Sequence, residues 1–202
     1  MGGIYAYGDL VPVVDPSAYV HPCAVLLGDV VIGAGCYVAP GAVLRGDFGR
    51  IELKAGANIQ DNCVAHSFPG QDVIVSEDGH VGHGAVLHGC LIGRNVMVGM
   101  NAVVMDEAVI GENSIVGAMA FVKAGMQVPA ASLVLGSPAR VIRSLTDQEI
   151  AWKTKGTGVY QQLAASAAGL IRPVTPLSAP EPDRQRLHGP EHIPLRRLKE
   201  PG

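Results

Sequence analysis

Two histidines, His83 and His88, lie five residues apart in a glycine-rich run, and a third, His66, precedes His83 by seventeen residues. Three neutral imidazoles can hold a zinc ion tetrahedrally and leave its fourth position to water, which is the arrangement of a catalytic rather than a structural zinc site. Such a site requires the three rings to meet in space. The elements that carry the rings therefore decide whether this chemistry is available.

Composition argues against several classes of partner. The 202 residues carry a formal net charge of −3, which favours neither nucleic acid nor an anionic membrane surface. The sequence has no signal-peptide pattern and no run of about eighteen apolar residues, so we expect a cytoplasmic protein without a membrane span. The four cysteines lack CxxC spacing and are expected to be reduced and mostly buried.

An aliphatic residue recurs at steps of six through most of the chain. A small or turn-forming residue usually follows it, as in Ile32-Gly33 and Val98-Gly99, and this pattern is typical of short strands joined by tight turns. Three hexads would form one coil of a triangular solenoid with the aliphatic residues stacked inside. We therefore predict an all-β solenoid domain over residues 1–140. The predicted inward residues are Val14, Val20, Leu26, Ile32, Val38, Leu44, Leu53, Ile59, Ala65, Val75, Val81, Leu87, Ile92, Val98, Val104, Ile110, Val116, Val122, Val128 and Val134.

Two breaks in this register predict loops. The step from Leu44 to Leu53 is nine residues, so the segment 45–50 holds three extra positions. The step from Ala65 to Val75 is ten residues, so the segment 67–72 is expected to bulge outward. Loops on a rigid scaffold are common places for function.

The register also aligns the histidines. His66 and His88 each follow the inward residue on the third face of successive coils, which stacks them at the strand spacing of roughly 4.8 Å. His83 follows the inward residue of the second face and lies at a different corner. We therefore expect His83 to join the histidine pair of a neighbouring chain, and a threefold assembly would close three identical sites.

Four successive motifs resemble those of the γ-class carbonic anhydrase-like hexapeptide-repeat family. They are Arg45-Gly46-Asp47, the run NIQDN at 58–62, His66, and the run GHGAVLHGC at 82–90. The resemblance covers about residues 10–145. It implies a left-handed parallel β-helix and a homotrimer with the metal between subunits. By position it implies that the ligands are His66, His83 and His88, holding Zn²⁺, with Fe²⁺ or Co²⁺ as alternatives.

The same resemblance implies roles for four further residues. Gln60 corresponds to a residue that positions metal-bound water, and Arg45 with Asp61 to a salt bridge between subunits. Asp47 is implied to arrange solvent or substrate near the metal. From their residue types alone, the three charged side chains fit structural interface charges equally well, and Gln60 fits a hydrogen-bonding residue at a coil edge equally well.

The remaining histidines and the nearby cysteine receive no role in the predicted site. Cys90 lies in an apolar context and is expected to pack rather than react. The other histidines show no alignment with the three candidate ligands, so we expect surface positions for His21, His80, His188 and His192.

The C-terminal part of the chain departs from the repeat. The segment 136–140 (GSPAR) ends the solenoid in a turn, and Thr146 followed by Glu149 predicts a capping box for a helix beginning about Asp147. Gly156 and Gly158 are expected to interrupt this helix before a second segment through Ala168. We assign 141–170 to a helical segment that covers the solenoid, and 171–202, rich in proline and arginine, to an extended or disordered tail or an arm that wraps another subunit.

Within the family, residues 145–153 (LTDQEIAWK), continuing to Gly156-Thr157 and Tyr160-Gln161, resemble the phenylacetic acid degradation (PaaY) group. Relatives from carnitine metabolism share much of this pattern. The resemblance to the PaaY group implies a metal-dependent hydrolase of acyl-CoA thioesters in phenylacetate degradation. Zinc lowers the pKa of bound water from 15.7 to about 7, so the expected mechanism is attack of metal-bound hydroxide on the thioester carbonyl.

Three other functions stay open at this point. A γ-class carbonic anhydrase would use the same site on CO2 and bicarbonate, but the loop 67–72 lacks the glutamate that the highly active enzymes use as a proton shuttle. A CoA-dependent acyltransferase would need one catalytic histidine and no metal, which the three aligned histidines argue against. A metal-stapled trimeric scaffold without catalysis is the last alternative.

Overall fold

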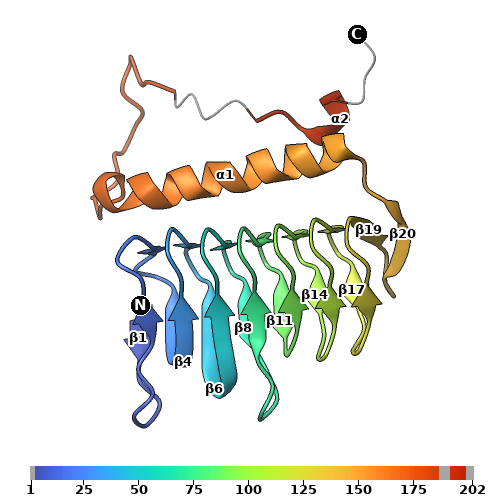
Figure 1. Cartoon of the computed structure of the whole chain (residues 1–202). Coiled ribbons are helices and arrows are strands. Elements are labelled where there is room, and N and C mark those ends of the chain that lie inside the picture. Colours follow the sequence, from blue (N-terminus) through green and yellow to red (C-terminus); the bar gives the residue numbers. More distant parts are fainter. Residues whose placement is uncertain (1–2, 187–191, 199–202) are drawn as a thin grey trace.

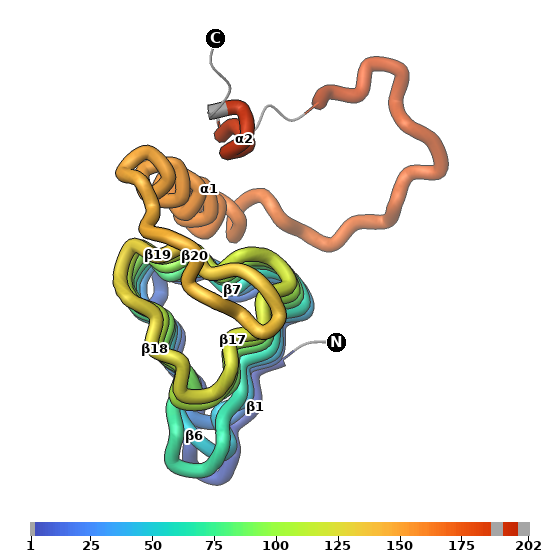
Figure 2. Tube along the Cα trace, turned by 90° about the vertical axis from the view of Figure 1, so that its right-hand side faces the viewer, coloured from blue at the N-terminus to red at the C-terminus, as the bar shows by residue number. Residues whose placement is uncertain are grey.

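The computed structural model describes residues 3–186 and 192–198. Short parallel strands follow one another around a triangular path, and successive coils stack along one axis (Figure 1). The chain is a left-handed parallel β-helix of about seven turns followed by one long helix, which confirms the predicted fold class. Viewed along its axis, the solenoid has three walls (Figure 2).

We call the first wall the histidine wall because it carries His66 and His88. Its strands are β1 (Gly3–Tyr5), β4 (Val25–Ile32), β6 (Val43–Leu53), β8 (Val64–His66), β11 (Val86–His88), β14 (Val103–Val104) and β17 (Phe121–Val122). The long strands β4 and β6 bend around a corner and continue into a second wall. That second wall adds β2 (Val13–Val14), β9 (Val73–Val75), β12 (Leu91–Ile92), β15 (Val109–Ile110) and β18 (Gln127–Val128).

We call the third wall the helix wall because the long helix covers it. Its strands are β3 (Tyr19–Val20), β5 (Tyr37–Val38), β7 (Asn58–Ile59), β10 (His80–Val81), β13 (Met97–Val98), β16 (Ile115–Val116) and β19 (Ser132–Leu135). After a turn, β20 (Arg140–Ser144) pairs antiparallel with β19 and ends the solenoid. All other strand pairs in the three walls are parallel, which places equivalent residues of successive coils directly above one another.

The interior of the solenoid is the predicted aliphatic ladder. Leu87 pairs with Ala65 on one side and Val104 on the other, and all three are 0% exposed. Corresponding pairs stack along the other two walls, so the inward residues form one continuous core. Each buried valine, leucine or isoleucine contributes about 1.5–3 kcal/mol relative to an exposed one. The six-residue periodicity therefore predicted both the fold and its core correctly.

Asparagines turn several of the tight corners between walls. Asn62, Asn95, Asn101 and Asn113 have φ angles of 59°, 54°, 56° and 60°. Asparagine tolerates this left-handed region better than most non-glycine residues do. The corners therefore repeat without displacing the inward ladder.

The helix α1 (Asp147–Leu170) begins with the predicted capping box. The Thr146 side chain accepts a hydrogen bond from the Glu149 backbone, and the Glu149 carboxylate accepts one from the Thr146 backbone. Arg143 adds two bonds of 2.8 Å to the same carboxylate. The first turn of the helix is thereby fixed to the strand that precedes it.

The predicted interruption at Gly156 and Gly158 is wrong, because α1 is one continuous helix of 24 residues. A glycine inside a helix is less favourable than alanine by about 1 kcal/mol. Here the helix packs along the helix wall, where Thr157 is buried beside His80, and Gly156 is buried beneath His192. Packing therefore outweighs the local preference.

Residues 171–186 form an extended segment without regular structure, and a short helix α2 (Leu195–Leu198) follows. The Trp152 ring stacks on His192 at 5.2 Å between centroids, and Trp152 Nε1 donates to the Ile193 carbonyl at 2.8 Å. This part of the chain thus returns to α1. Within the described ranges, neither helix combines the length and the apolar character needed to cross a bilayer.

Candidate metal centre

His66 and His88 lie at the ends of the neighbouring strands β8 and β11 and are register partners. Their rings are 5.3 Å apart between centroids at an interplanar angle of 61°. Only 13% and 22% of their side chains are exposed. The stacking expected from the hexad register is therefore confirmed, and it brings two imidazoles to one corner of the solenoid.

His83 lies at the opposite edge of the same wall, in the turn before β11. Its side chain is 46% exposed, and its Nδ1 is 2.7 Å from Asp61 Oδ2. The three-residue strand β11 separates it from His88 on the same chain. Among the residues that the structure describes, no three histidine, cysteine, aspartate or glutamate side chains of one chain gather in a metal-binding arrangement.

A carboxylate orients each of the three imidazoles. His83 Nδ1 donates to Asp61, and His88 Nδ1 donates to Asp106 Oδ1 at 2.7 Å. A carboxylate can only accept, so the proton lies on Nδ1 and Nε2 remains for a metal. His66 differs, because its Nε2 is 3.1 Å from Asp47 Oδ1 and its Nδ1 is the remaining nitrogen.

Burial is the main reason that the pKa of His66 is lowered, and the nearby Arg45 adds to the effect. Burial alone would raise the pKa of Asp47, but hydrogen bonds and the charge from Arg45, together with the bond from His66, lower it overall. Arg45 Nη1 donates to Asp47 Oδ2 at 2.7 Å. The corner therefore holds a neutral imidazole beside an ionised carboxylate at neutral pH.

Two of the sequence-predicted residues, Asp61 and Gln60, do not reach the histidine pair within one chain. Arg45 pairs with Asp47 and not with Asp61, which lies at the His83 corner. The predicted bridge between Arg45 and Asp61 would thus have to join two subunits, and it stays a prediction.

Gln60 is 2% exposed and faces α1 rather than the histidine pair. Its Nε2 donates to His80 Nε2 at 2.7 Å and to Asn58 Oδ1 at 3.1 Å. In the single chain it therefore acts as a buried hydrogen-bonding residue, and the implied role toward a metal-bound water stays a prediction.

The expected surface position of His80 is wrong, because it is 8% exposed beneath α1. Burial, with smaller contributions from the positive charges of Lys153, His83 and His192, lowers the pKa of His80 to about 3. The repeat register could have indicated this burial, because it makes His80 the neighbour of Asn58 on the next coil. Both lie on the wall that the helix covers. His21 and His192 are partly exposed, and His188 lies outside the described residues.

Asp106 is the residue near the site that the sequence reasoning missed. Val104 is the register partner of Leu87, and Asp106 follows Val104 by two residues. The coil below His88 therefore supplies the carboxylate that orients it. Cys90, also next to the site, is 2% exposed, and burial raises its pKa to about 12, which confirms a packing role.

The segments at the two register breaks, 45–50 and 67–72, are joined to each other at this corner. The loop predicted at 45–50 is wrong, because these residues continue the strand β6, whereas 67–72 is a loop. Gly70 N donates to the Phe48 carbonyl at 3.1 Å, and Arg50 N donates to Asp72 Oδ1 at 2.9 Å. A Cβ on Gly49 would lie 1.7 Å from the Gln71 carbonyl oxygen, so only glycine permits this approach. The segments 45–50 and 67–72 are thus held together beside the histidines.

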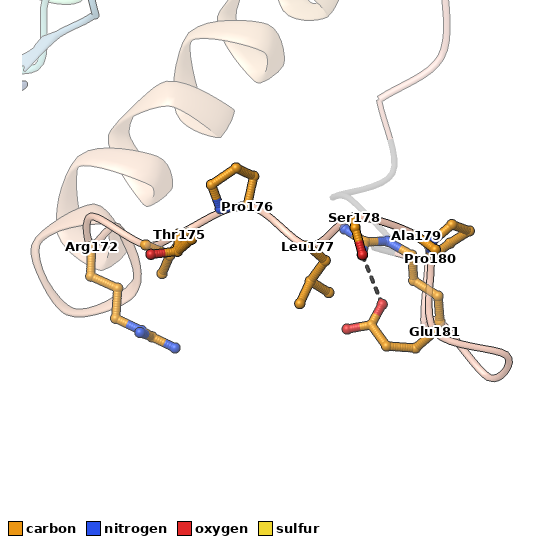
Figure 3. Close-up of a pocket in the computed structure, with 10 residues that line it drawn as sticks. Arg172, Thr175, Pro176, Leu177, Ser178, Ala179, Pro180 and Glu181 are labelled. Atoms are coloured by element: carbon orange, nitrogen blue, oxygen red, sulfur yellow. Dashed lines mark hydrogen bonds and ion pairs between the residues drawn. The ribbon is translucent and has the colours of Figure 1, made fainter.

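The donor set fits zinc. It offers three imidazoles, and a carboxylate holds the other nitrogen of each, an arrangement usual among metal-binding histidines. A cavity of about 770 Å³ is lined by residues of the tail segment from Arg172 to Arg184, and none of the three candidate ligands is among them (Figure 3).

Comparison with known proteins identifies a matching family model and several similar proteins. A family model described as bacterial transferase hexapeptide (six repeats) matches residues 12–46 and 89–124. The carnitine operon protein CaiE of Proteus is 53% identical over 190 residues, which are 94% of this chain and 96% of that protein. The CaiE protein of Salmonella dublin is 56% identical over 185 residues, 92% of this chain and 93% of that protein.

This chain belongs to the hexapeptide-repeat transferase family. Among solved structures, a Bacillus cereus protein assigned as an acetyltransferase matches with a TM-score of 0.81 and 30% identity, over 83% of this chain and 98% of that one. A hexapeptide transferase family protein of Anaplasma phagocytophilum matches with a TM-score of 0.78 and 36% identity over the same shares. The left-handed β-helix is thus shared with these solved relatives.

Proposed function

We propose that this hexapeptide-repeat protein is a metal-dependent acyl-CoA thioesterase that works as a homotrimer. In this proposal each metal lies between two subunits and is bound by His66 and His88 of one subunit and by a third ligand, the partner subunit's His83. The arrangement of the histidine wall is the observation that carries it. His83 lies at one edge of this wall, and the stacked pair lies at the other.

The outer face of the histidine wall supports an interface between copies. Outward residues of successive strands form an entirely apolar column of Val25, Val43, Val64, Val86, Val103 and Phe121. Val64 and Phe121 remain 38% and 39% exposed in the single chain. The second wall is different, since polar residues interrupt its outer column at Glu52 and Gln127. An apolar face bordered by incomplete metal sites is best covered by another copy.

Zn²⁺, or Fe²⁺ or Co²⁺ in its place, would activate a water as nucleophile and polarise a carbonyl oxygen when bound by these imidazoles. Asp61 and Asp106 hold His83 and His88 in the tautomer that leaves Nε2 available. Asp47 is kept ionised beside Arg45 and lies next to His66, which supports a role in arranging solvent or substrate near the metal. Water adds to the thioester carbonyl carbon, the carbon–sulfur bond breaks, and the CoA sulfur takes up a proton.

The pathway within this proposal is the degradation of phenylacetate, supported by the likeness of residues 145–153 to the PaaY group. The CaiE relatives are named for the carnitine operon, and their identity of 53% and 56% makes carnitine metabolism the competing pathway. We expect the protein to act in the cytoplasm, where acyl-CoA is made and used.

Hydration of CO2 is the second candidate function. The loop 67–72 has no glutamate of its own, but Gln71 Nε2 donates to Glu107 Oε1 at 3.1 Å, and Glu107 N donates to the Gly89 carbonyl at 2.7 Å. An exposed carboxylate from the next coil is therefore fixed beside the site, where a proton shuttle is needed. This observation favours the γ-class carbonic anhydrase activity more than the sequence did.

A CoA-dependent acyltransferase is favoured by the family model and by the Bacillus cereus relative. Metal content separates it from the hydrolase. About one zinc or iron per chain supports the hydrolase, whereas full activity after metal removal supports the transferase. A non-catalytic scaffold would keep a stable metal-bound trimer and release no CoA from any thioester.

Mixed trimers test the shared site directly. His83→Ala and His88→Ala chains are each expected to be inactive. A 1:1 mixture, co-refolded with zinc, should recover about a quarter of the wild-type CoA release, because three quarters of random trimers are mixed and each mixed trimer has one complete site of three. The measurement is thiol release from phenylacetyl-CoA.

Three results would speak against the proposal. A mixture as inactive as its components would place the whole site within one chain. Wild-type protein that hydrates CO2 briskly but releases no CoA from any aryl- or cycloalkyl-CoA would reverse the order of the two activities. Activity that survives complete removal of the metal would favour the transferase.

A further inference from the structure

Four aromatic rings lie in a row across the candidate site. Phe48 packs against His66 with 5.3 Å between ring centroids, and His66 packs against His88 at 5.3 Å. Phe68 then meets His88 edge-on, at 5.1 Å and an interplanar angle of 82°. The two phenylalanines therefore stand on either side of the histidine pair.

These two phenylalanines are not part of the core. The chain has three phenylalanines in 202 residues, and its interior is built from aliphatic residues. Phe48 and Phe68 are 47% and 57% exposed in the single chain. An exposed apolar ring contributes little to folding. Because both rings lie against the candidate site, their exposed surface is available for contact with an apolar ligand group.

The backbone holds both rings in place before any ligand arrives. Phe48 lies on the part of β6 that bends around Gly49, and its carbonyl accepts the hydrogen bond from Gly70. The carbonyl of Phe68 accepts a bond of 3.1 Å from Gln71 N, which closes the turn that carries it. Fixing these two segments in advance reduces the entropy lost when a ligand is bound.

The charges around the rings favour a neutral ligand group. The Arg45 guanidinium carbon already lies 5.9 Å from the centroid of the Phe48 ring. A second cation over this ring would meet like charge from Arg45 as well as from a bound metal ion. The rings therefore offer apolar contact and edge-to-face stacking rather than a cage for a quaternary ammonium group.

We propose that Phe48 and Phe68 form an acyl clamp that selects thioesters with a neutral ring-shaped acyl group, aryl or cycloalkyl, over acetyl and over trimethylammonium-bearing acyl groups. The clamp rests on the proposed thioesterase function. The ring of the acyl group packs on the exposed phenylalanine surface beside the histidine pair, and the thioester carbonyl reaches that pair. Phe48 and Phe68 determine specificity and take no part in bond breaking.

The test compares kcat/KM on the metal-loaded full chain for phenylacetyl-CoA, cyclohexanecarbonyl-CoA, acetyl-CoA and a trimethylammonium-bearing acyl-CoA. Phe48→Ala and Phe68→Ala should each lower kcat/KM for the two ring substrates by about tenfold or more and change acetyl-CoA by less than about threefold. Phe48→Leu, which keeps apolar area, should recover part of the loss. Ile142→Ala, a residue 54% exposed on β20, is the matched control and should change no ratio.

An unchanged ratio of ring to acetyl substrates in both alanine variants would overturn the clamp. So would dissociation of the trimer in either variant, measured by light scattering, because the rings would then be subunit contacts. If the wild type releases CoA from no thioester, the thioesterase proposal itself has failed. Calorimetric binding of phenylacetate then decides the clamp, which stands only if Phe48→Ala and Phe68→Ala weaken that binding and Ile142→Ala does not.

Discussion

The histidine wall and the helix wall share one inward ladder but differ on their outer faces. Outward residues of the histidine wall form an apolar column in which Val64 and Phe121 are more than a third exposed, and the helix α1 lies on a different wall. Outward residues of the helix wall include Asn58 and His80, which are buried under α1 and hydrogen-bonded. The inner face thus specifies the solenoid, while the outer face decides what each wall binds.

The two walls are also covered by different means. On the helix wall, Lys153 of α1 donates to the backbone carbonyl and to the side-chain oxygen of Asn95, and burial lowers the pKa of Lys153 to about 7. Polar partners there come from the same chain and are satisfied on folding. On the histidine wall, the chain leaves an apolar column and the stacked pair His66 and His88, which we propose that a second chain covers. The proposed function depends on the wall that α1 leaves uncovered.

The largest effect is expected from a charge placed on the histidine wall. Val86→Glu would bury three carboxylates in the trimer, at a penalty of several kcal/mol for each. We expect monomers by light scattering, loss of bound zinc, and a drop in turnover of about a hundredfold or more. Val109→Glu, the same change on the outer column of the second wall, is the control and should leave the trimer intact. A Val86→Glu protein that is still trimeric and zinc-loaded would show that the histidine wall is not the subunit interface.

An intermediate effect is expected from acid on the helix wall. The pKa of His80 is about 3 in the fold, against 6.5 for an unperturbed histidine. Below pH 6.5 the unfolded chain takes up a proton that the folded chain does not. The free energy of unfolding therefore decreases as the pH is lowered from 6.5 to about 3. The slope from this one group is at most about 1.4 kcal/mol per pH unit.

His80→Gln should therefore flatten the fall in stability between pH 6 and pH 4 relative to the wild type, as measured by urea unfolding at each pH. His21→Gln, which changes a partly exposed histidine, is the control and should run parallel to the wild type. Parallel curves for His80→Gln would mean that the ring is already protonated in the fold. A protonated His80 would then be no less stable under α1 than at the protein surface.

The smallest effect is expected where α1 meets this network. Thr157 Oγ1 lies 3.5 Å from His80 Nδ1 and 3.4 Å from the Lys153 carbonyl, so both bonds are long. Thr157→Val keeps the shape and should lower the free energy of unfolding by about 0.5–1 kcal/mol without changing the trimer. Thr175→Val in the exposed tail is the control. A loss above about 3 kcal/mol would show that the threonine contributes more than these two bonds.

The sequence correctly predicted the features that the six-residue repeat determines, namely the register of the coils and the positions of the histidines. Because hexads set the register, they placed Leu87 over Ala65, stacked His88 on His66, and put His83 at another corner. The same counting located the loop 67–72, but the loop predicted at 45–50 is part of the continuous strand β6. These predictions rest on a periodicity that recurs in every coil, so chance spacing at one place could not mislead them.

The errors arose where a distant part of the chain decides the environment. His80 looked like a surface residue because the sequence does not state which wall α1 covers. Gly156 and Gly158 looked like an interruption because helix propensity is local and the packing that overrides it is not. Asp106 and Glu107 reach the site from the next coil, and only the three-dimensional register reveals their proximity.

The course of α1 has a consequence for how the molecule comes apart. A stack of coils joined only to its neighbours can fray from either end, one repeat at a time. Here one helix runs back along the stack, contacting β3, β5 and β7 and reaching Asn95 beyond β12. Early and late coils therefore share a single brace. Amide hydrogens along the braced wall should exchange together, in one cooperative opening, rather than in order of their distance from the ends.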